Sequence, residues 1–228
     1  GGHAEILLSA SEKLHVIGLD CDPANIEHAA ARLDRFKSRL VIKNANFADL
    51  RSVLNELAVD RVGGILADLG VSSNQIANPL KGLSFEIDGP LDMRLDPALP
   101  RTAADLVNSL PEGELADLLY LQSQERHSRR IAKRICQVRR NGRLNSTVAL
   151  ARLIASAVGD NPDAPRGRIH PATRTFMALR ISVNRELHSL SQLLAQAPQC
   201  LSVGGVVTVI SFHSMEDRLV KEDFRQRK

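Results

Sequence analysis

The sequence predicts an α/β protein whose mostly parallel sheet is interrupted by a helical insert. Three observations predict it. Short apolar runs at 14–19, 39–47 and 63–70 alternate with helix-like segments, and a block of helical patterns begins near residue 101. A β-branched run at 204–212 then resumes the strand pattern. The helical block is therefore predicted to lie between two strands of one sheet.

The first predicted strand ends on two acids, Asp20 and Asp22, which flank Cys21. Apolar residues at helical spacing follow through Leu33. An acid at the carboxyl end of a strand is the arrangement that holds a ribose in doubly wound proteins. The alternative is that Asp22 caps the helix while Asp20 is solvated at the strand end. This stretch alone leaves both interpretations open.

The other elements before residue 101 fit the same pattern. Gly1-Gly2-His3 runs into a helix, as in nucleotide loops, although such loops normally follow a strand. Residues 39–47 form a second strand that ends in a polar turn, and residues 50–58 are predicted helical. Residues 63–70 form the third strand. The carboxyl ends of these strands are expected to line one ligand-binding crevice.

Within the helical block, a helix is predicted to start at Ser109, which would cap it while Glu112 reaches back to it. Helical patterns continue over residues 114–122, 125–140 and 146–158, and a loop rich in Pro, Asp and Gly follows at 159–171. One long helix is then predicted from Thr173 to Ala195. Its apolar face consists of Phe176, Leu179, Val183, Leu187, Leu190 and Leu194.

The amino-acid composition is typical of a globular protein with an apolar core. Apolar residues make up 43% of the 228, which predicts a real core, and no apolar run is long enough to cross a bilayer. Cys21, Cys136 and Cys200 show no metal-ligand spacing. Isolated cysteines predict a reducing, cytoplasmic setting without a metal site or a disulfide framework.

The net charge of +4 is unevenly distributed. Residues 1–100 carry 10 Lys/Arg and 14 Asp/Glu, a balance of −4, whereas residues 101–228 carry 20 and 12, a balance of +8. The basic half is therefore expected to face a polyanion.

The densest basic segment is 126–143, with eight Lys/Arg and no acid. Ile131, Ile135 and Val138 form an apolar seam along it, which predicts an amphipathic helix with a basic outer face. Such a face binds phosphates, although a merely solvated helix face is the alternative.

Three irregular stretches could carry chemistry. In ADLGVSSNQ (67–75), Asp68 closes a strand and Gly70 permits a tight turn. The polar side chains of Ser72, Ser73 and Gln75 could hold a cofactor and a substrate edge, or the serines could simply cap a helix. In FEIDGPLDMR (85–94), Asp92 and Arg94 could serve a ligand or brace the insert. In SFHSMEDR (211–218), His213 could contact a substrate or bond the loop backbone.

These pieces together resemble one family. GGH, LDCDP, NANF, DLGVSSNQ, FEIDGPLDMR, HPATRTFMALRI-VN and SFHSMEDR occur in order along nearly the whole chain. They resemble the bacterial-type small-subunit ribosomal RNA cytosine-N4 methyltransferases, which use S-adenosylmethionine. The resemblance implies a class I, Rossmann-like methyltransferase sheet with an inserted helical domain. It implies an S-adenosylmethionine-binding part at 1–100, a helical RNA-recognition insert at 101–172, and a return to the α/β domain at 173–228.

The resemblance also implies roles for individual residues. Asp20 would accept hydrogen bonds from the cofactor ribose, and Phe47 would pack on the adenine. The remaining cofactor residues would be Gly1, Gly2, His3, Asp68 and Gln75, while Arg174 and His213 would bind substrate. Asp68, Asp92 and His213 are candidate proton acceptors, and none is assigned. The expected partner is small-subunit ribosomal RNA or the assembled subunit, with the target cytosine unstacked.

The sequence departs from the family at both ends. Family members have an amino-terminal strand in the middle of the sheet and further residues after the SFHS-EDR motif. We therefore expect a fragment that binds the cofactor poorly alone, with unpaired edges on two core strands. Two rival functions remain: a non-catalytic RNA-binding or ribosome-assembly protein, and a dinucleotide-dependent oxidoreductase, which the missing GxGxxG motif disfavours.

Overall fold

The computed structural model describes residues 1–160 and 169–227. Contacts within the chain divide it into two compact units, Gly1–Leu69 with Leu187–Lys228, and Gly70–Glu186. We call them the strand unit and the helical unit. The first is assembled from two separate stretches of sequence, whereas the second is continuous. Each unit has its own secondary structure and its own core.

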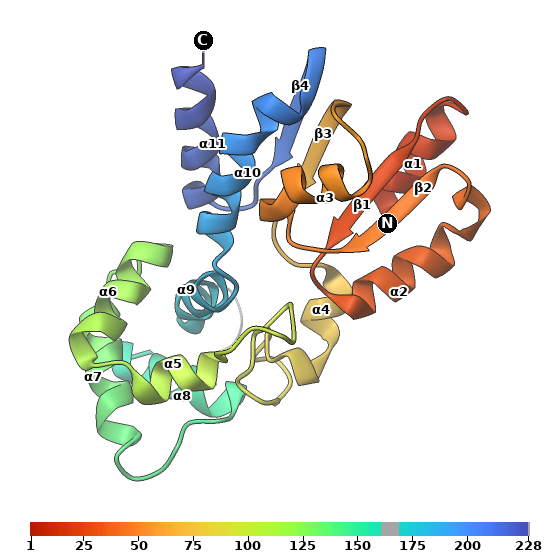
Figure 1. The fold of residues 1–228 in the computed structure, drawn as a ribbon. Coiled ribbons are helices and arrows are strands. Elements are labelled where there is room, and N and C mark those ends of the chain that lie inside the picture. Colours follow the sequence, from red (N-terminus) through yellow and green to blue (C-terminus); the bar gives the residue numbers. More distant parts are fainter. Residues whose placement is uncertain (161–168, 228) are drawn as a thin grey trace. The chain divides into compact units, whose positions relative to one another are not determined.

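The strand unit contains four strands and five α-helices within the described residues (Figure 1). Its first half contains α1 (Gly2–Ala10), β1 (Val16–Asp20), α2 (Pro23–Arg32), β2 (Leu40–Asn44), α3 (Leu50–Glu56) and β3 (Val62–Asp68). Its second half contains α10 (Glu186–Cys200), β4 (Leu201–Ile210) and α11 (Ser214–Gln226). The strands and helices expected before residue 70 are thus confirmed to within a few residues.

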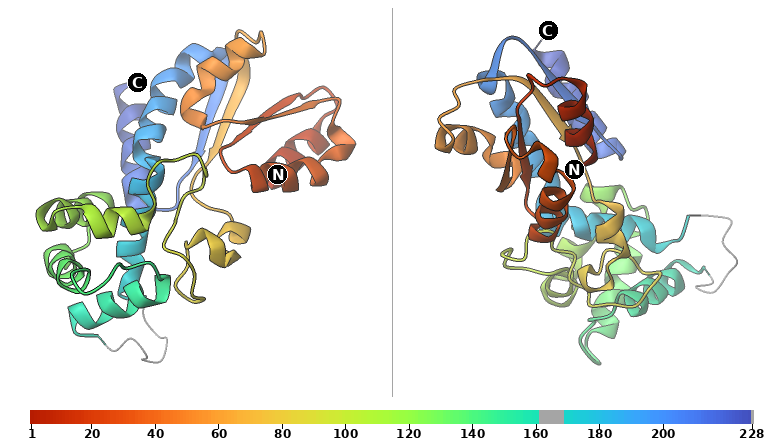
Figure 2. Two further views of the ribbon diagram at one scale, coloured as in Figure 1. Left: turned by 60° about the horizontal axis from the view of Figure 1, so that its bottom comes forward. Right: turned by 90° about the vertical axis from the view of Figure 1, so that its right-hand side faces the viewer.

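The strands form two parallel pairs. β1 pairs with β2, with Val16 opposite Leu40, and β3 pairs with β4, with Ile65 opposite Val207. Figure 2 shows β3 and β4 running side by side. The β3–β4 pair confirms that the helical block lies between two strands of one sheet. The described residues contain two separate two-stranded sheets, so the prediction of a single sheet for all strands is wrong. The unpaired edges expected on two core strands agree with this arrangement, because β1 and β3 are not paired with each other.

The reason for this error is physical. Alternating strands and helices predict parallel pairing, because a crossover helix returns the chain in the same direction. They do not reveal which strands share a ladder, because the hydrogen bonds between strands leave no mark on either sequence.

Helices pack against both strand pairs, and β1 contributes side chains to apolar clusters on both of its faces. Leu8 of α1 packs with Leu33 and Phe36 against the β1–β2 pair. Leu190 and Leu194 of α10 pack with Leu69 against the β3–β4 pair. No residue of the four strands is fully buried in the described structure. Parallel strands are ordinarily buried on both faces, so these pairs carry an unusually open apolar surface.

The helical unit is a bundle around one large core. Its helices are α4 (Ser73–Ala77), α5 (Ala103–Ser109), α6 (Glu112–Ser123), α7 (Ser128–Val138), α8 (Thr147–Val158) and α9 (Ala172–Asn184). Leu115 and Leu119 of α6, Ile131 and Ile135 of α7, and Leu179 of α9 are all essentially inaccessible. The apolar seam predicted for residues 126–143 is confirmed, since Ile131 and Ile135 are buried and Val138 packs against the same core.

Two details of the predicted helices are wrong. Arg185, with φ of 53°, breaks the long helix expected from Thr173 to Ala195 into α9 and α10. A left-handed residue cannot continue the α-helix, and apolar spacing does not report it. Ser109 does not cap α6, because it is the last residue of α5 and its hydroxyl donates to the Asp105 carbonyl. The backbone before α6 is set instead by Pro111, which occupies the cap position.

The helical unit extends beyond the bounds of 101 and 172 that the sequence suggested for the insert, because it comprises Gly70–Glu186. Leu91 and Met93 precede residue 101 but are buried in the helical core. Phe176 and Leu179 of α9, beyond residue 172, lie in the same core. Most of the loop predicted at 159–171 lies outside the described residues. Among those described, no helix has the length and apolar character of a membrane span.

Candidate functional site

Asp20 ends β1, as the sequence predicts, and its carboxylate is held in place by its neighbours. Oδ1 accepts from the Asp22 backbone N–H at 2.8 Å, and Oδ2 accepts from the Asn25 side chain at 3.1 Å. Each carboxylate oxygen can accept two hydrogen bonds, so one on each stays available. Asp20 is half-buried. An oriented acceptor at the end of a parallel strand is suited to a pair of hydroxyl donors.

Asp22 caps a helix, which is one of the interpretations that the sequence left open. It is the N-cap of α2, its side chain accepts from the Ala24 N–H, and it is almost fully buried. The capping interpretation of Asp22 is therefore confirmed. Cys21 lies between the two acids and is half-buried.

The amino-terminal glycines begin α1. Gly1 is its N-cap and Gly2 its first residue. A side-chain carbon on Gly1 would come within 3.3 Å of Leu33, whereas one on Gly2 would meet nothing within 4 Å. A side chain on Gly1 would therefore crowd the Leu33 side chain slightly, whereas the second glycine leaves open space at the helix start.

His3 and Asp68 are brought together, which the sequence did not predict. His3 Nδ1 lies 3.2 Å from Asp68 Oδ2, and the two side chains are 49% and 42% exposed. The pair links the first turn of α1 to the carboxyl end of β3. Because both partners face solvent, the contact adds little to stability and leaves both groups accessible.

Phe47 starts a short 3₁₀ helix after β2. Its ring packs partly into two apolar clusters, one around Leu54 and Leu193 and one around Leu69 and Leu190. A partly covered aromatic ring in this place is a suitable platform for a flat ligand.

Gln75 lies in the helical unit and has a local structural role. Ser72 and Gln75 form a capping box at the start of α4, in which Gln75 Oε1 accepts from the Ser72 N–H at 2.8 Å. Gln75 is buried. Gly70 has φ of 90°, so the tight turn predicted for ADLGVSSNQ is confirmed, as is the capping serine.

His213 is the N-cap of α11, and its ring is 10% exposed. Nδ1 accepts from the Glu216 N–H at 3.4 Å, and Nε2 lies 3.2 Å from Glu216 Oε1. Burial by itself raises the pKa of Glu216, but hydrogen bonds from His213 and the Phe212 N–H hold this pKa below its ordinary value. His213 therefore bonds the loop backbone, and its expected contact with a substrate stays a prediction.

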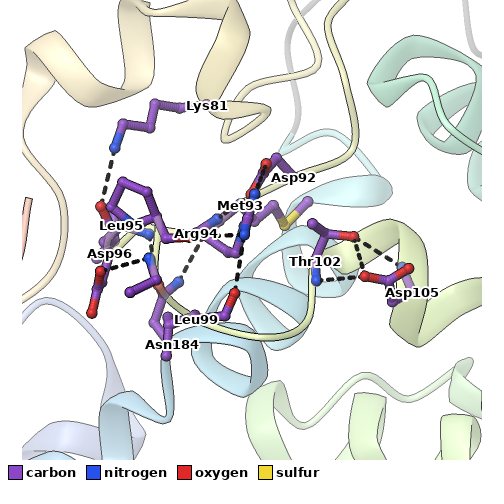
Figure 3. A network of polar contacts seen from close by, with 12 residues as sticks. Lys81, Asp92, Met93, Arg94, Leu95, Asp96, Leu99, Thr102, Asp105 and Asn184 are labelled. Carbon is purple, nitrogen blue, oxygen red and sulfur yellow. Dashed lines mark hydrogen bonds and ion pairs between the residues drawn. The ribbon is translucent and has the colours of Figure 1, made fainter.

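The Asp92-Met93-Arg94 turn lies in a network of polar contacts (Figure 3). Arg94 Nε and Nη2 donate to the two Asp92 oxygens at 2.8 and 2.9 Å. Burial alone raises the pKa of Asp92, but the Arg94 bonds outweigh it and leave the pKa below its ordinary value. Arg94 also donates to the carbonyls of Pro97 and Leu99. The Asp92–Arg94 pair thus braces the loop that leads into the helices, which is one of the two roles considered for it.

Asn184, which was not among the predicted site residues, fixes this turn to α9. Its side chain accepts from the Leu95 N–H and donates to the Met93 carbonyl, both at 2.8 Å (Figure 3). Met93 has φ of 65°, a conformation that these bonds help to hold. Asn184 is the last residue of the HPATRTFMALRI-VN stretch. Its place in this motif is the one feature of the sequence that could have marked it as a site residue. Arg174 lies exposed in the first turn of α9.

The comparisons with known proteins agree on one family. A model of the MraW methylase family matches residues 1–228. The chain is 47% identical to the ribosomal RNA small subunit methyltransferase H of Syntrophobacter fumaroxidans, over 99% of this chain and 70% of that protein. It is 48% identical to the protein of the same name from Carboxydothermus hydrogenoformans, over 99% and 71%. The chain belongs to the MraW methylase family.

Proposed function

We propose that this protein transfers a methyl group from S-adenosylmethionine to the exocyclic N4 of a cytidine in small-subunit ribosomal RNA. The observation that carries the proposal is membership of the MraW methylase family over the whole described chain, with relatives named as small-subunit ribosomal RNA methyltransferases. The motifs that carried the sequence resemblance, from GGH to SFHSMEDR, lie within this match. The class I, Rossmann-like arrangement of the strand unit is part of the proposal.

The residues of the strand unit fit the proposed cofactor. Hydrogen bonds from the Asp22 N–H and the Asn25 side chain orient the Asp20 carboxylate. Each of its two oxygens can accept one more hydrogen bond, so the pair could bind the two neighbouring hydroxyls of a ribose. Phe47 presents a partly covered ring for the adenine. Gly1, Gly2, His3 and Asp68 would bind the methionine end, and Gln75 would hold the loop after β3 through its capping box. S-adenosylmethionine supplies an electrophilic methyl group on a positively charged sulfur.

The protein must hold the cytosine amine in line with that methyl group and accept its proton, because the amine lone pair is delocalised into the ring. Among the three candidate acceptors, Asp92 is disfavoured, since both its oxygens bind Arg94 and its pKa is lowered. His213 Nδ1 is used by the α11 backbone. Asp68 keeps an exposed carboxylate beside His3 and is the candidate that the geometry leaves open.

RNA recognition is assigned to the helical unit. Its helix α7 is buried on one side and strongly basic on the other. We propose that this unit, which contains the predicted insert at 101–172, grips folded ribosomal RNA or the assembled small subunit while Arg174 and His213 contact the substrate. The target base must leave its stack to be methylated.

The test is transfer of labelled methyl from S-adenosylmethionine to under-methylated small ribosomal subunits, followed by nucleoside analysis. The Syntrophobacter fumaroxidans relative serves as the positive control. Labelled N4-methylcytidine is the expected product. Asp20→Asn keeps the side-chain shape but removes the charge that strengthens its hydrogen bonds, so transfer at low cofactor concentration should fall roughly 10- to 100-fold while RNA binding is unchanged.

Asp34→Asn is the matched control, because Asp34 is an exposed acid of the same unit. It should transfer methyl like the parent chain. Equal activity of Asp20→Asn and Asp34→Asn would remove the ribose role from Asp20. Because a fragment is expected to bind the cofactor poorly alone, a version extended by the amino-terminal strand of the relative is tested beside this chain. Label from the relative but from neither of these two versions, with RNA still bound, would replace the proposal with a non-catalytic RNA-binding function.

A further inference from the structure

The eight cations between residues 126 and 143 do not all have the same role. Arg139 donates to the Val107 carbonyl at 2.8 Å, and Arg143 Nη2 lies 2.6 Å from Asp105 Oδ1. Both Asp105 and Val107 belong to α5. These two arginines therefore fasten the end of α7 to a neighbouring helix, and their charge is already engaged within the protein.

A second group of cations has no such role. Arg126, Arg129, Arg130, Lys133 and Arg134 are all exposed, and no hydrogen bond or ion pair joins their side chains to any described residue. The eighth cation, Arg140, is exposed in the same way but lies beyond the end of α7 and is left out of the group. We call this group the α7 cation strip. No acidic residue occurs between Glu125 and Asp160, and Glu125 itself is buried. The strip therefore has no carboxylate neighbour along α7.

The helix geometry places these charges on one face. Arg129 and Lys133, and likewise Arg130 and Arg134, are four residues apart, so each pair projects from the same side on successive turns. The opposite side carries Ile131 and Ile135, which are completely buried. Burial of this apolar side fixes the rotation of α7, so the strip must face solvent. Five like charges crowded on three turns repel one another unless an external anion neutralises them.

We propose that the α7 cation strip is the phosphate-binding surface of this protein for RNA, and that Arg139 and Arg143 take no part in it. The choice of RNA rests on the proposed function. Folded RNA presents closely spaced phosphates, and several aligned cations gain affinity by releasing its counterions. Tyr120 and the six phenylalanines are not on α7, so the strip would bind backbone without stacking on bases.

An anionic membrane surface fits the strip less well. Membrane-bound amphipathic helices insert an apolar face into the lipid while their cations meet the head groups. The apolar face of α7 is occupied by the core of the helical unit. The outward face offers charge alone, which suits a polyelectrolyte.

The test compares two triple variants with the parent chain. The first is Arg129→Gln, Lys133→Gln and Arg134→Gln. The matched control is Lys13→Gln, Lys37→Gln and Arg225→Gln, three exposed cations of the strand unit without a hydrogen bond or ion pair from their side chains to a described residue. Binding of short mixed-sequence RNA is measured by fluorescence anisotropy over a range of salt concentrations. Far-UV circular dichroism checks that all three proteins are folded.

The strip variant should lose about 100-fold in RNA affinity at about 0.1 M salt. Each phosphate contact contributes about 0.7 to the slope of log affinity against log salt, so three contacts contribute about 2. Between about 0.1 M and about 1 M salt, which is one decade, a slope of about 2 corresponds to about 100-fold. The strip variant's plot of log affinity against log salt should also be shallower by about 2. The control should bind like the parent. Equal losses in the two variants, or no loss in the strip variant, would overturn the proposal.

Two further measurements separate this proposal from the proposed function. RNA binding is measured without cofactor. Loss of binding in the strip variant would therefore support the strip even if the protein transferred no methyl group. If methyl transfer occurs and the strip variant needs no more RNA for half-saturation, the strip is refuted while the function stands. Tighter binding of anionic phospholipid vesicles than of RNA, abolished in the strip variant, would assign the surface to membranes instead.

Discussion

The helices of the helical unit and the strands of the strand unit bury their apolar residues to very different extents. In the helical unit, Leu115, Leu119, Ile131, Ile135 and Leu179 are completely inaccessible or nearly so. In the strand unit, no residue of β1, β2, β3 or β4 is fully buried, and Leu66 and Val206 are 39% and 62% exposed. The unit formed by one continuous stretch has a closed core, whereas the unit that carries the proposed cofactor residues has open strand faces.

The difference shows that order of the backbone and burial of side chains are separate properties. β1–β2 and β3–β4 each keep a regular parallel ladder. A ladder needs only backbone donors and acceptors, whereas the free energy of burial depends on apolar area removed from water. The stability of this chain is therefore expected to reside mainly in the helical unit.

The largest predicted effect tests this imbalance directly. Leu119→Ala removes a fully buried side chain of α6 and should cost about 2–5 kcal/mol of unfolding free energy, because it leaves a cavity. Leu66→Ala makes the same change on an exposed face of β3 and should cost less than about 1 kcal/mol. Urea unfolding followed by circular dichroism, with hydrogen exchange assigning the loss to a unit, measures both. Equal costs would contradict the comparison.

A smaller effect concerns acid stability of the helical unit. The pKa of Asp92 is lowered in the folded protein, so its contribution to stability is present above the unfolded-state value of about 3.9 and is lost as the pH falls through the lower folded value. Asp92→Asn leaves Arg94 without its carboxylate and should cost about 1–2 kcal/mol near neutral pH.

The same variant should lose less stability on acidification than the parent chain. Comparing urea midpoints at neutral pH and at about pH 3 measures the two changes together. Asp34→Asn, on an exposed acid of the strand unit, is the control. An Asp92→Asn protein as stable as the parent at neutral pH would show that the Arg94 contacts to Pro97 and Leu99 suffice to hold the turn.

Much of this organisation could be predicted from the sequence, and the failures have specific causes. Strands ending at Asp20 and Asp68 and the buried seam of α7 follow from local periodicity, which a single segment reveals. The His3–Asp68 contact could not be predicted, because it joins residues 65 positions apart without a shared pattern. The bracing role of Asn184 was hidden for the same reason, since its partners lie near residue 94.

The smallest predicted effect is at the break between α9 and α10. Arg185 has φ of 53°, a conformation that costs a non-glycine residue about 1 kcal/mol. Arg185→Gly should relieve that strain and, after the added flexibility of the unfolded chain, stabilise the protein by roughly 0.5 kcal/mol. Arg185→Ala keeps the strain and is the control. Thermal unfolding measures the shift, and a destabilised glycine variant would mean that the arginine side chain itself holds the break.

The pairing of β3 with β4 also determines the order in which the chain can fold. During synthesis the ribosome releases residues 70–186 before β4 has been made, so the helical core can form while β3 still has no partner. Closing a loop of that length carries a large entropy cost in an unfolded chain, and a bundle already folded within it lowers that cost. The contiguous bundle is therefore expected to fold early and quickly, with the parallel ladder across it as the late, slow step.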